Sequence, residues 1–310
     1  MATTQLSKAG TEKALKKILA TEKSDLTIPI VIVSLAIMAG LVFVALLDYI
    51  GSLNVPLEPI DWIIFAMVAV FGPYGSYVSK RESHVHEIEM RLPDFLRDVA
   101  EAGRFGMTLA AAIVIASSGR YGRLTPEIKK MAAQIEWGVP ASEAIRLFSE
   151  RVKTPLVTRM TSIIMKANDA GGNVADVLTM VSHDAKETIL TQEERSVTMS
   201  TYVMVVYISF FVFIATILIL QLQFLPKMEE AGRTVSEQAE EQGLEEIPGV
   251  SIKVENIGAV SFIFLLAVIV HAAGDGILAG VIQKGSISIG LKHSTIMLLA
   301  GFFSLRLLFT

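Results

Sequence analysis

The sequence lacks cysteine and the common catalytic motifs. Without cysteine, its 310 residues cannot form disulfides, zinc sites built on thiolates or a thiol nucleophile. No G-x-x-x-x-G-K-S/T segment is present, which excludes nucleotide binding by a P-loop, and neither G-x-S-x-G nor H-E-x-x-H occurs. His183 and Glu187 would share a helical face, but two ligands make a poor metal site. We therefore predict that the protein is not an enzyme and binds no cofactor or metal.

Charge is absent or rare in five long stretches. With 52% hydrophobic residues and a mean hydropathy of +0.54, the chain is more apolar than most soluble proteins. Each stretch has about the length needed to cross a hydrocarbon core, although the fifth is short and contains Arg306. The stretches cover residues 27–47, 60–78, 198–225, 257–282 and 294–309. The second contains Pro73, which we expect to kink it.

Lysine and arginine are distributed unevenly over the segments between these stretches. Five lysines precede the first stretch, whereas residues 48–59 contain no lysine or arginine. Residues 226–255 carry eight glutamates against three basic residues. Because cytoplasmic segments hold the excess of basic residues, we predict a multi-pass cell-membrane protein with its N terminus and residues 80–197 in the cytoplasm. Residues 226–255 and the C terminus would then be extracytoplasmic.

A polar block between the second and third stretches is built from one repeated phrase. Its turn glycines Gly106, Gly138 and Gly171 lie 32 and 33 residues apart, and each is followed at fixed offsets by an apolar residue, a small residue and Ile or Leu. Such a repeat is typical of stacked supersecondary units, which bind partners more readily than they catalyse reactions. Proline and capping signals predict six helices. These cover about 86–104, 108–118, 126–137, 140–152, 155–170 and 173–195.

The glycines of the block have two interpretations. The favoured one is a left-handed turn that ends a helix at Gly106, Gly138 and Gly171, with Gly172 continuing the last turn. The alternative is an anion-binding nest at Gly171 and Gly172. Residues 80–195 contain sixteen basic and sixteen acidic residues, so the block is neutral and offers nucleic acid no basic surface.

The predicted fold is therefore all-α, with about five transmembrane helices and a six-helix cytoplasmic bundle inserted between the second and third of them. The first 26 residues form either an amphipathic helix on the lipid bilayer or a solvated helix. In order, the predicted parts are a cytoplasmic amphipathic segment at 1–26, two transmembrane helices at 27–79, the bundle at 80–197, a third transmembrane helix at 198–225, an acidic extracytoplasmic loop at 226–255 and two transmembrane helices at 256–310.

Ionisable residues also lie inside the apolar stretches. His271 and Asp275 are one helical turn apart in the fourth stretch, where such groups are costly and are candidates for a function. They would hydrogen-bond neighbouring spans, relay a proton or ion, or contact another helix that Gly274, Gly276 and Gly280 allow to approach. Because Arg306 lies at the outer end of its span, Asp61 or Asp48 is the partner that we expect for it.

Three segments of the block resemble the type II secretion F family. They are LPDFLRDVAEAGRFGMTLAAAI, the G-x-P-x-x-E-A-I element and ANDAGGNVADVLTMVSHD, and the segment HAAGDGILAGVIQKGSISIGLKHS extends the resemblance with an archaeal character. The resemblance implies an inner-membrane platform protein of type IV pili, type II secretion or archaella, not an enzyme. Many members have two such domains and this chain has one, as in Tad-type and related archaeal pili, which implies pairing with a second copy or a paralogous subunit.

The resemblance also implies partners for the two parts of the chain. The bundle would contact a hexameric secretion ATPase on the cytoplasmic side, with Arg104, Arg120 and Arg123 as candidate contacts or else as part of a solvated face. The spans would receive pilin-like subunits, with His271, Gly274, Asp275 and Gly280 as candidate contacts. The alternative functions are a small-solute transporter or channel, which would need a polar path across several spans, and a membrane-anchored scaffold.

Overall fold

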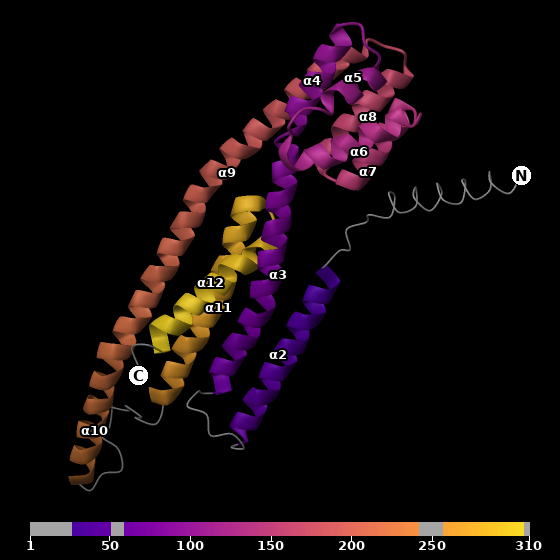
Figure 1. Ribbon diagram of the computed structural model, residues 1–310. Coiled ribbons are helices and arrows are strands. Elements are labelled where there is room, and N and C mark those ends of the chain that lie inside the picture. The colour runs from indigo at the N-terminus through magenta and orange to yellow at the C-terminus, as the bar shows by residue number, and fades with distance from the viewer. Residues whose placement is uncertain (1–26, 51–58, 242–256, 307–310) are drawn as a thin grey trace, which may run out of the picture. The chain divides into compact units, whose positions relative to one another are not determined.

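The chain is helical throughout the parts that the computed structural model describes, which are residues 27–50, 59–241 and 257–306 (Figure 1). No strand occurs in these ranges, so the predicted all-α fold is confirmed. The chain divides into two compact units. The bundle unit contains residues 81–193, and the membrane unit contains residues 27–80 and the described residues from 194 onward. The amphipathic segment predicted at 1–26 lies outside the described residues.

Five helices of the described chain are long and apolar enough to cross a membrane, which confirms the predicted number. They are α2 (Thr27–Tyr49), α3 (Pro59–Glu89), α9 (Val174–Ile219), α11 (Ile257–Lys284) and α12 (Ile287–Arg306). Pro73 lies inside α3. Helix α12 begins well before the predicted residue 294, because Gly285 has a φ of 69° and turns the chain directly after α11.

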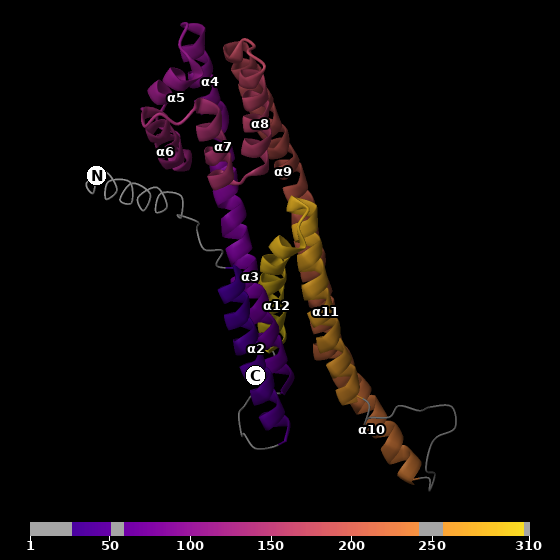
Figure 2. The same cartoon turned by 90° about the vertical axis from the view of Figure 1, so that its right-hand side faces the viewer.

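Helix α12 is the most enclosed span, although it is among the least hydrophobic. Its mean hydropathy is 1.3 and 39% of its apolar window is buried, against 3.0 and 11% for α2. Figures 1 and 2 show α11 and α12 side by side. Helix α12 shares one apolar core with three other helices. The buried residues of this core are Ile64 from α3, Phe210 and Ile214 from α9, Ile269 and Ala272 from α11, and Met297, Leu298 and Phe302 from α12. Because a larger share of it is enclosed by protein than in any other of the five spans, α12 tolerates polar side chains that a lipid-facing helix would not.

The bundle unit is a set of short helices around a single apolar core. The helices are α4 (Leu92–Arg104), α5 (Leu109–Ala116), the 3₁₀-helix η1 (Gly122–Leu124), α6 (Thr125–Glu136), α7 (Ala141–Val152), α8 (Pro155–Asp169) and the start of α9. Thr108 and Thr154 cap α5 and α8 by accepting hydrogen bonds from Ala111 N and Val157 N. The hydroxyls satisfy amides that the first helical turn leaves without a partner.

The sequence repeat extends into the helix before each turn glycine. In each hairpin, the residues 14 and 7 positions before the glycine and 7 and 10 positions after it are buried. These sets are Leu92, Leu124 and Val157; Val99, Met131 and Ile164; Ile113, Ile145 and Leu178; and Ala116, Phe148 and Val181. A spacing of seven residues is about two helical turns, so each set occupies an equivalent position in the three hairpins. The first two sets lie on α4, on α6 with the end of η1 before it, and on α8, and the last two sets lie on α5, α7 and α9. The bundle core is therefore made by three copies of one α-hairpin.

The first predicted helix of the block is divided in two. We expected one helix over 86–104, but α3 ends at Glu89 and α4 begins at Leu92. The break lies just before Pro93, which has no amide hydrogen to continue the helical ladder and is well suited to a first helical turn.

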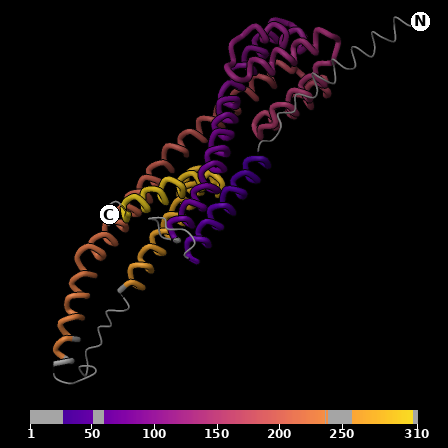
Figure 3. Tube along the Cα trace, turned by 60° about the horizontal axis from the view of Figure 1, so that its bottom comes forward, coloured from indigo at the N-terminus to yellow at the C-terminus, as the bar shows by residue number. Residues whose placement is uncertain are grey.

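The predicted end of the third span and the start of the acidic loop also need correction. The expected helix at 173–195 and the third transmembrane helix form one helix, α9, and a π-helical turn at Leu220–Phe224 leads into α10 (Leu225–Glu241) (Figure 3). The first part of the predicted loop is therefore helical. The ion pair between Arg233 and Glu229, four residues apart at 2.9 Å, lies on this helix and favours it. Residues 242–256 lie outside the described residues.

Candidate functional site

The turn glycines of the bundle unit have the left-handed backbone conformation that ends helices. The φ angles are 82° at Gly106, 89° at Gly138 and 67° at Gly171. Gly172 continues the third turn, and its amide donates to the carbonyl oxygen of Ala167 at 3.3 Å. Two aromatic side chains beside these turns are exposed to solvent, Phe105 at 84% and Trp137 at 81%. Exposed aromatic residues on a folded surface are typical of protein interfaces.

The three arginines predicted to contact an ATPase have different environments. Arg104 ends α4 and Arg120 lies between α5 and η1, and both side chains are exposed and unpaired among the described residues. Arg123 forms an ion pair with Glu87, and its Nη1 lies 2.5 Å from Nδ1 of His84. The prediction for Arg123 therefore changes, since its charge is matched within the bundle unit and links η1 to the end of α3.

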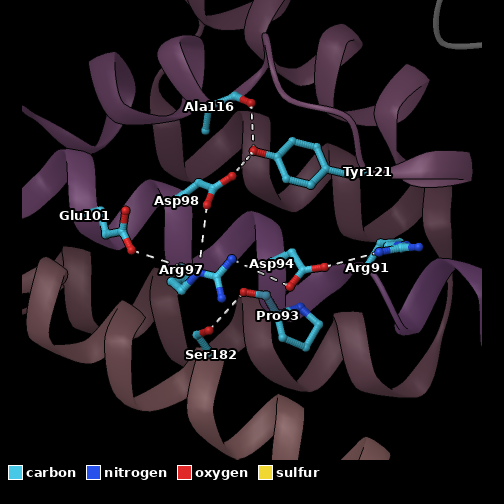
Figure 4. A network of polar contacts seen from close by, with 9 residues as sticks. All are labelled: Arg91, Pro93, Asp94, Arg97, Asp98, Glu101, Ala116, Tyr121 and Ser182. Atoms are coloured by element: carbon cyan, nitrogen blue, oxygen red, sulfur yellow. Dashed lines mark hydrogen bonds and ion pairs between the residues drawn. The ribbon is translucent and has the colours of Figure 1, made fainter.

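A polar network joins α4 to the segment that follows α5 (Figure 4). The hydroxyl of Tyr121 donates to Oδ2 of Asp98 at 2.6 Å and lies 3.0 Å from the carbonyl oxygen of Ala116. Burial, the hydrogen bond and the negative charge of Asp98 raise the pKa of Tyr121 well above its usual value of 10.0, so the phenol keeps its proton. Ser182, one of the repeated serines, donates to the carbonyl oxygen of Pro93 at 2.9 Å and joins α9 to α4.

Two glutamates that the sequence reasoning missed also stabilise the bundle unit. Glu89 is buried, and its Oε1 accepts a hydrogen bond from the amide of Leu156 at 3.1 Å, which adds a second cap to α8. Glu127 accepts hydrogen bonds from Lys130 at 2.8 Å and Arg151 at 2.9 Å. Burial alone would raise the pKa of Glu127, but these two cations outweigh it and hold the pKa below its usual value of 4.5. Leu156 and Arg151 are far from these glutamates in the sequence, so no local signal identifies their contacts, whereas Lys130 follows Glu127 by three residues and is a local helical pair.

An ion pair joins the ends of two spans in the membrane unit. Nη2 of Arg306 donates to Oδ2 of Asp61 at 2.6 Å, which confirms one of the two partners expected for this arginine. The Asp61 side chain is 4% exposed and that of Arg306 is 34% exposed. Asp61 lies in the first turn of α3 and Arg306 in the last turn of α12, so each charge also complements the dipole of its own helix.

The intramembrane pair of α11 lies at the surface of the membrane unit. Nδ1 of His271 is 3.4 Å from Oδ2 of Asp275, and the side chains are 50% and 25% exposed. The imidazole stacks on Phe213 of α9 with ring centroids 4.1 Å apart. A Cβ atom added to Gly274 would meet no atom within 4 Å. Of the predicted contact residues in the spans, these three lie together on an open face.

Gly280 serves a different purpose from the one predicted. A Cβ atom at Gly280 would overlap the backbone of Gly290, and one at Gly276 would overlap the backbone of Ser294. These glycines therefore allow α12 to approach α11, and they leave no room for a partner helix. The hydroxyl of Ser294 donates to the carbonyl oxygen of Ala273 at 2.8 Å and fixes the same contact.

A second polar cluster of the membrane unit was not predicted. His293 of α12 places Nδ1 2.8 Å from the Tyr207 hydroxyl of α9 and Nε2 3.3 Å from Oε1 of Gln283 on α11. If Tyr207 donates, Nδ1 accepts and Nε2 donates to Gln283, so one neutral imidazole satisfies both neighbours. Within the described ranges, no group of three or more His, Asp or Glu side chains is placed to hold a metal ion.

Comparison with known proteins identifies a conserved family in the centre of the chain. Residues 95–222 match the family described as Type II secretion system (T2SS), protein F. The chain is also 28% identical over 247 residues to the uncharacterized protein MJ1286 of Methanocaldococcus jannaschii, a match that covers 78% of this chain and 37% of that protein. The chain thus matches little more than a third of the length of this relative. No solved structure matches the chain significantly.

Proposed function

We propose that the chain is a platform subunit of a type IV filament or type II secretion machine, because residues 95–222 match the type II secretion system protein F family. In this role, a cytoplasmic secretion ATPase would act on the bundle unit, and the spans would receive pilin-like subunits. The observation that carries the proposal is the family match across a helical bundle and the span that follows it. The relative from Methanocaldococcus jannaschii favours an archaeal machine.

The absence of a P-loop from the sequence supports a division of labour between this chain and a partner. A subunit without its own nucleotide site receives work from an ATPase through contacts, and proteins of this kind are structural rather than enzymatic. We propose that the contact includes Arg104 and Arg120, which are exposed and unpaired among the described residues. Phe105, exposed beside Arg104, would supply the apolar anchor that charged contacts alone lack.

Co-purification of the full chain with the secretion ATPase tests this function. Wild-type chain should retain the ATPase, and the double variant Arg104→Ala with Arg120→Ala should retain at least roughly tenfold less, as expected when contact residues are removed from an interface. Arg146→Ala is the matched control, because Arg146 is also exposed but is held by Glu143 and Glu150 of its own helix. A wild-type chain that retains no ATPase would count against the platform function and favour a transporter.

Equal retention by the double variant and the control would contradict the contact site and leave the platform function intact. A second measurement concerns the whole chain. Deleting its gene should abolish the filament or the secreted product, and re-expression of the full chain should restore it. Filaments that persist after the deletion would overturn the proposed function.

A further inference from the structure

The His271 and Asp275 pair lies deep within its span. Helix α11 covers Ile257–Lys284, so its midpoint falls beside His271. At about 1.5 Å per residue, Asp275 is roughly 7 Å from this midpoint, inside the half-thickness of about 15 Å of a hydrocarbon core. Both side chains therefore lie at a depth where lipid offers no hydrogen bonds.

The face of α11 that carries this pair is open. Val270 is 62% exposed and Leu278 is 48% exposed, and Gly274 lies between them without any atom near its missing side chain. Phe213 covers one side of the imidazole of His271. These positions follow the spacing of one helical stripe, so Val270, His271, Gly274, Asp275 and Leu278 form a notch, which we call the α11 notch.

Lipid is a poor neighbour for this notch. The Asp275 carboxylate can accept about four hydrogen bonds, and His271 supplies one long contact of 3.4 Å. An acceptor that is only partly satisfied at this depth is costly, and a small residue beside it allows a helix backbone to approach closely. The notch therefore combines open space beside Gly274 with a carboxylate that can accept further hydrogen bonds.

We propose that the α11 notch receives the apolar helix of a pilin-like subunit, and that this helix places a hydrogen-bond donor or a cation beside the Asp275 carboxylate. The identity of the occupant rests on the proposed function. The complementary charge does not depend on that function, because it follows from the carboxylate itself. The apolar residues Val270 and Leu278 would contact the same helix one turn on either side.

A second copy of the chain fits this notch less well. Arg306 is already paired with Asp61. Lys292 is exposed on α12, but at about 100° per residue it lies roughly 200° around the helix from Gly290, which faces α11. Lys292 is therefore on the side of α12 that faces away from α11, where its backbone lies against Gly75 of α3, and it is not part of the face that carries the notch.

The lack of cysteine makes the test specific. In a full-length Val270→Cys variant the new thiol is unique, so a benzophenone maleimide attaches at the edge of the notch alone and leaves Gly274 unchanged. The variant is expressed with an epitope-tagged pilin-like subunit of the same machine, and irradiated membranes are probed for an adduct that contains both proteins. Ile37→Cys is the control, because Ile37 is 47% exposed on α2 and, like Val270, lies next to the middle of its span. We expect at least roughly tenfold more adduct from the notch than from the control.

The carboxylate is tested in the same background. Asp275→Asn in the Val270→Cys chain should lower the adduct by roughly tenfold at equal membrane abundance, because the charge that selects the donor is lost, whereas Leu278→Ala should change it far less. Equal labelling from both cysteine positions, an adduct of two copies of the chain, or an adduct unaffected by Asp275→Asn would each overturn the proposal. If deletion of the gene abolishes filaments but the notch gives no adduct, the platform function stands and the proposed binding at the notch is contradicted. If filaments persist after the deletion, the platform function itself is contradicted.

Discussion

The ion pair between Asp61 and Arg306 gives a quantitative prediction for the membrane unit. Removing one partner of a buried pair costs about 3–5 kcal/mol when both charges are enclosed. Asp61 is almost fully enclosed, but Arg306 is 34% exposed, so solvent screening places the loss below this range, at about 2–3 kcal/mol. Asp61→Asn and Arg306→Gln should each destabilise the unit by this amount.

The pair can be measured through a tryptophan next to it. The chain has two tryptophans, Trp62 beside Asp61 and the exposed Trp137 of the bundle unit. Replacing Trp137 by Phe leaves Trp62 as the only tryptophan reporter of the membrane unit. Unfolding by increasing SDS in mixed micelles, followed by the fluorescence of Trp62, then gives the free energy of unfolding for each variant.

A double-mutant cycle shows whether the two charges act on each other. If they do, the double variant should be less destabilised than the sum of the two single variants by about 1–3 kcal/mol. The exchanged variant, with Asp61→Arg and Arg306→Asp, should recover only part of the loss, because each charge would then oppose its helix dipole at about 0.3–1 kcal/mol. Arg233→Gln is the control, because its pair with Glu229 is exposed and should contribute less than about 1 kcal/mol. Losses that add within about 0.5 kcal/mol would refute the coupling.

Three further predictions concern other contacts. Gly280→Ala should destabilise the membrane unit by about 1–3 kcal/mol because its methyl group would overlap α12, whereas Gly274→Ala should change SDS unfolding by less than about 0.5 kcal/mol. Tyr121→Phe should lower the free energy of unfolding by about 1–2 kcal/mol at neutral pH. Because the pKa of Tyr121 in the folded protein exceeds 10.0, the advantage of the wild type should persist below pH 10 and shrink as the pH rises above it. Urea unfolding followed through Trp137 measures both effects. Glu127→Gln should destabilise the bundle unit above pH 4.5 and lose this effect as the pH falls below that value, because the folded pKa is depressed; an unchanged difference in acid would contradict the assignment.

Much of the fold could be predicted because its signals are local. Five apolar stretches were visible from length and charge alone, and turn glycines with capping residues marked most of the bundle helices. The partner of Arg306 was also within reach, since two charges at the same end of neighbouring spans have few other options. Such predictions depend only on the position of a residue within its own element.

The remaining features depend on contacts between distant residues. Nothing near Glu89 in the sequence indicates that it caps a helix 67 residues later. The prediction of a loop was wrong for residues 226–241 for a related reason. Acidic composition is compatible with a solvated helix as well as with a loop, and α10 satisfies its backbone internally. Arg123 looked like a free surface charge until the fold placed Glu87 and His84 beside it.

Glycine illustrates why the candidate contacts of α11 had to be separated by structure. Gly274 and Gly280 each follow an alanine, and we expected the same role for both from the sequence. Six residues apart, they lie on different faces of one helix, so only one of them can face α12. Since Gly280 is committed to the backbone of Gly290, any helix that approaches the ionisable pair must use the face of Gly274. The ionisable pair and the open space beside Gly274 therefore lie together at the α11 notch. Substitutions at this notch should show whether the pair binds another helix or only stabilises its own span.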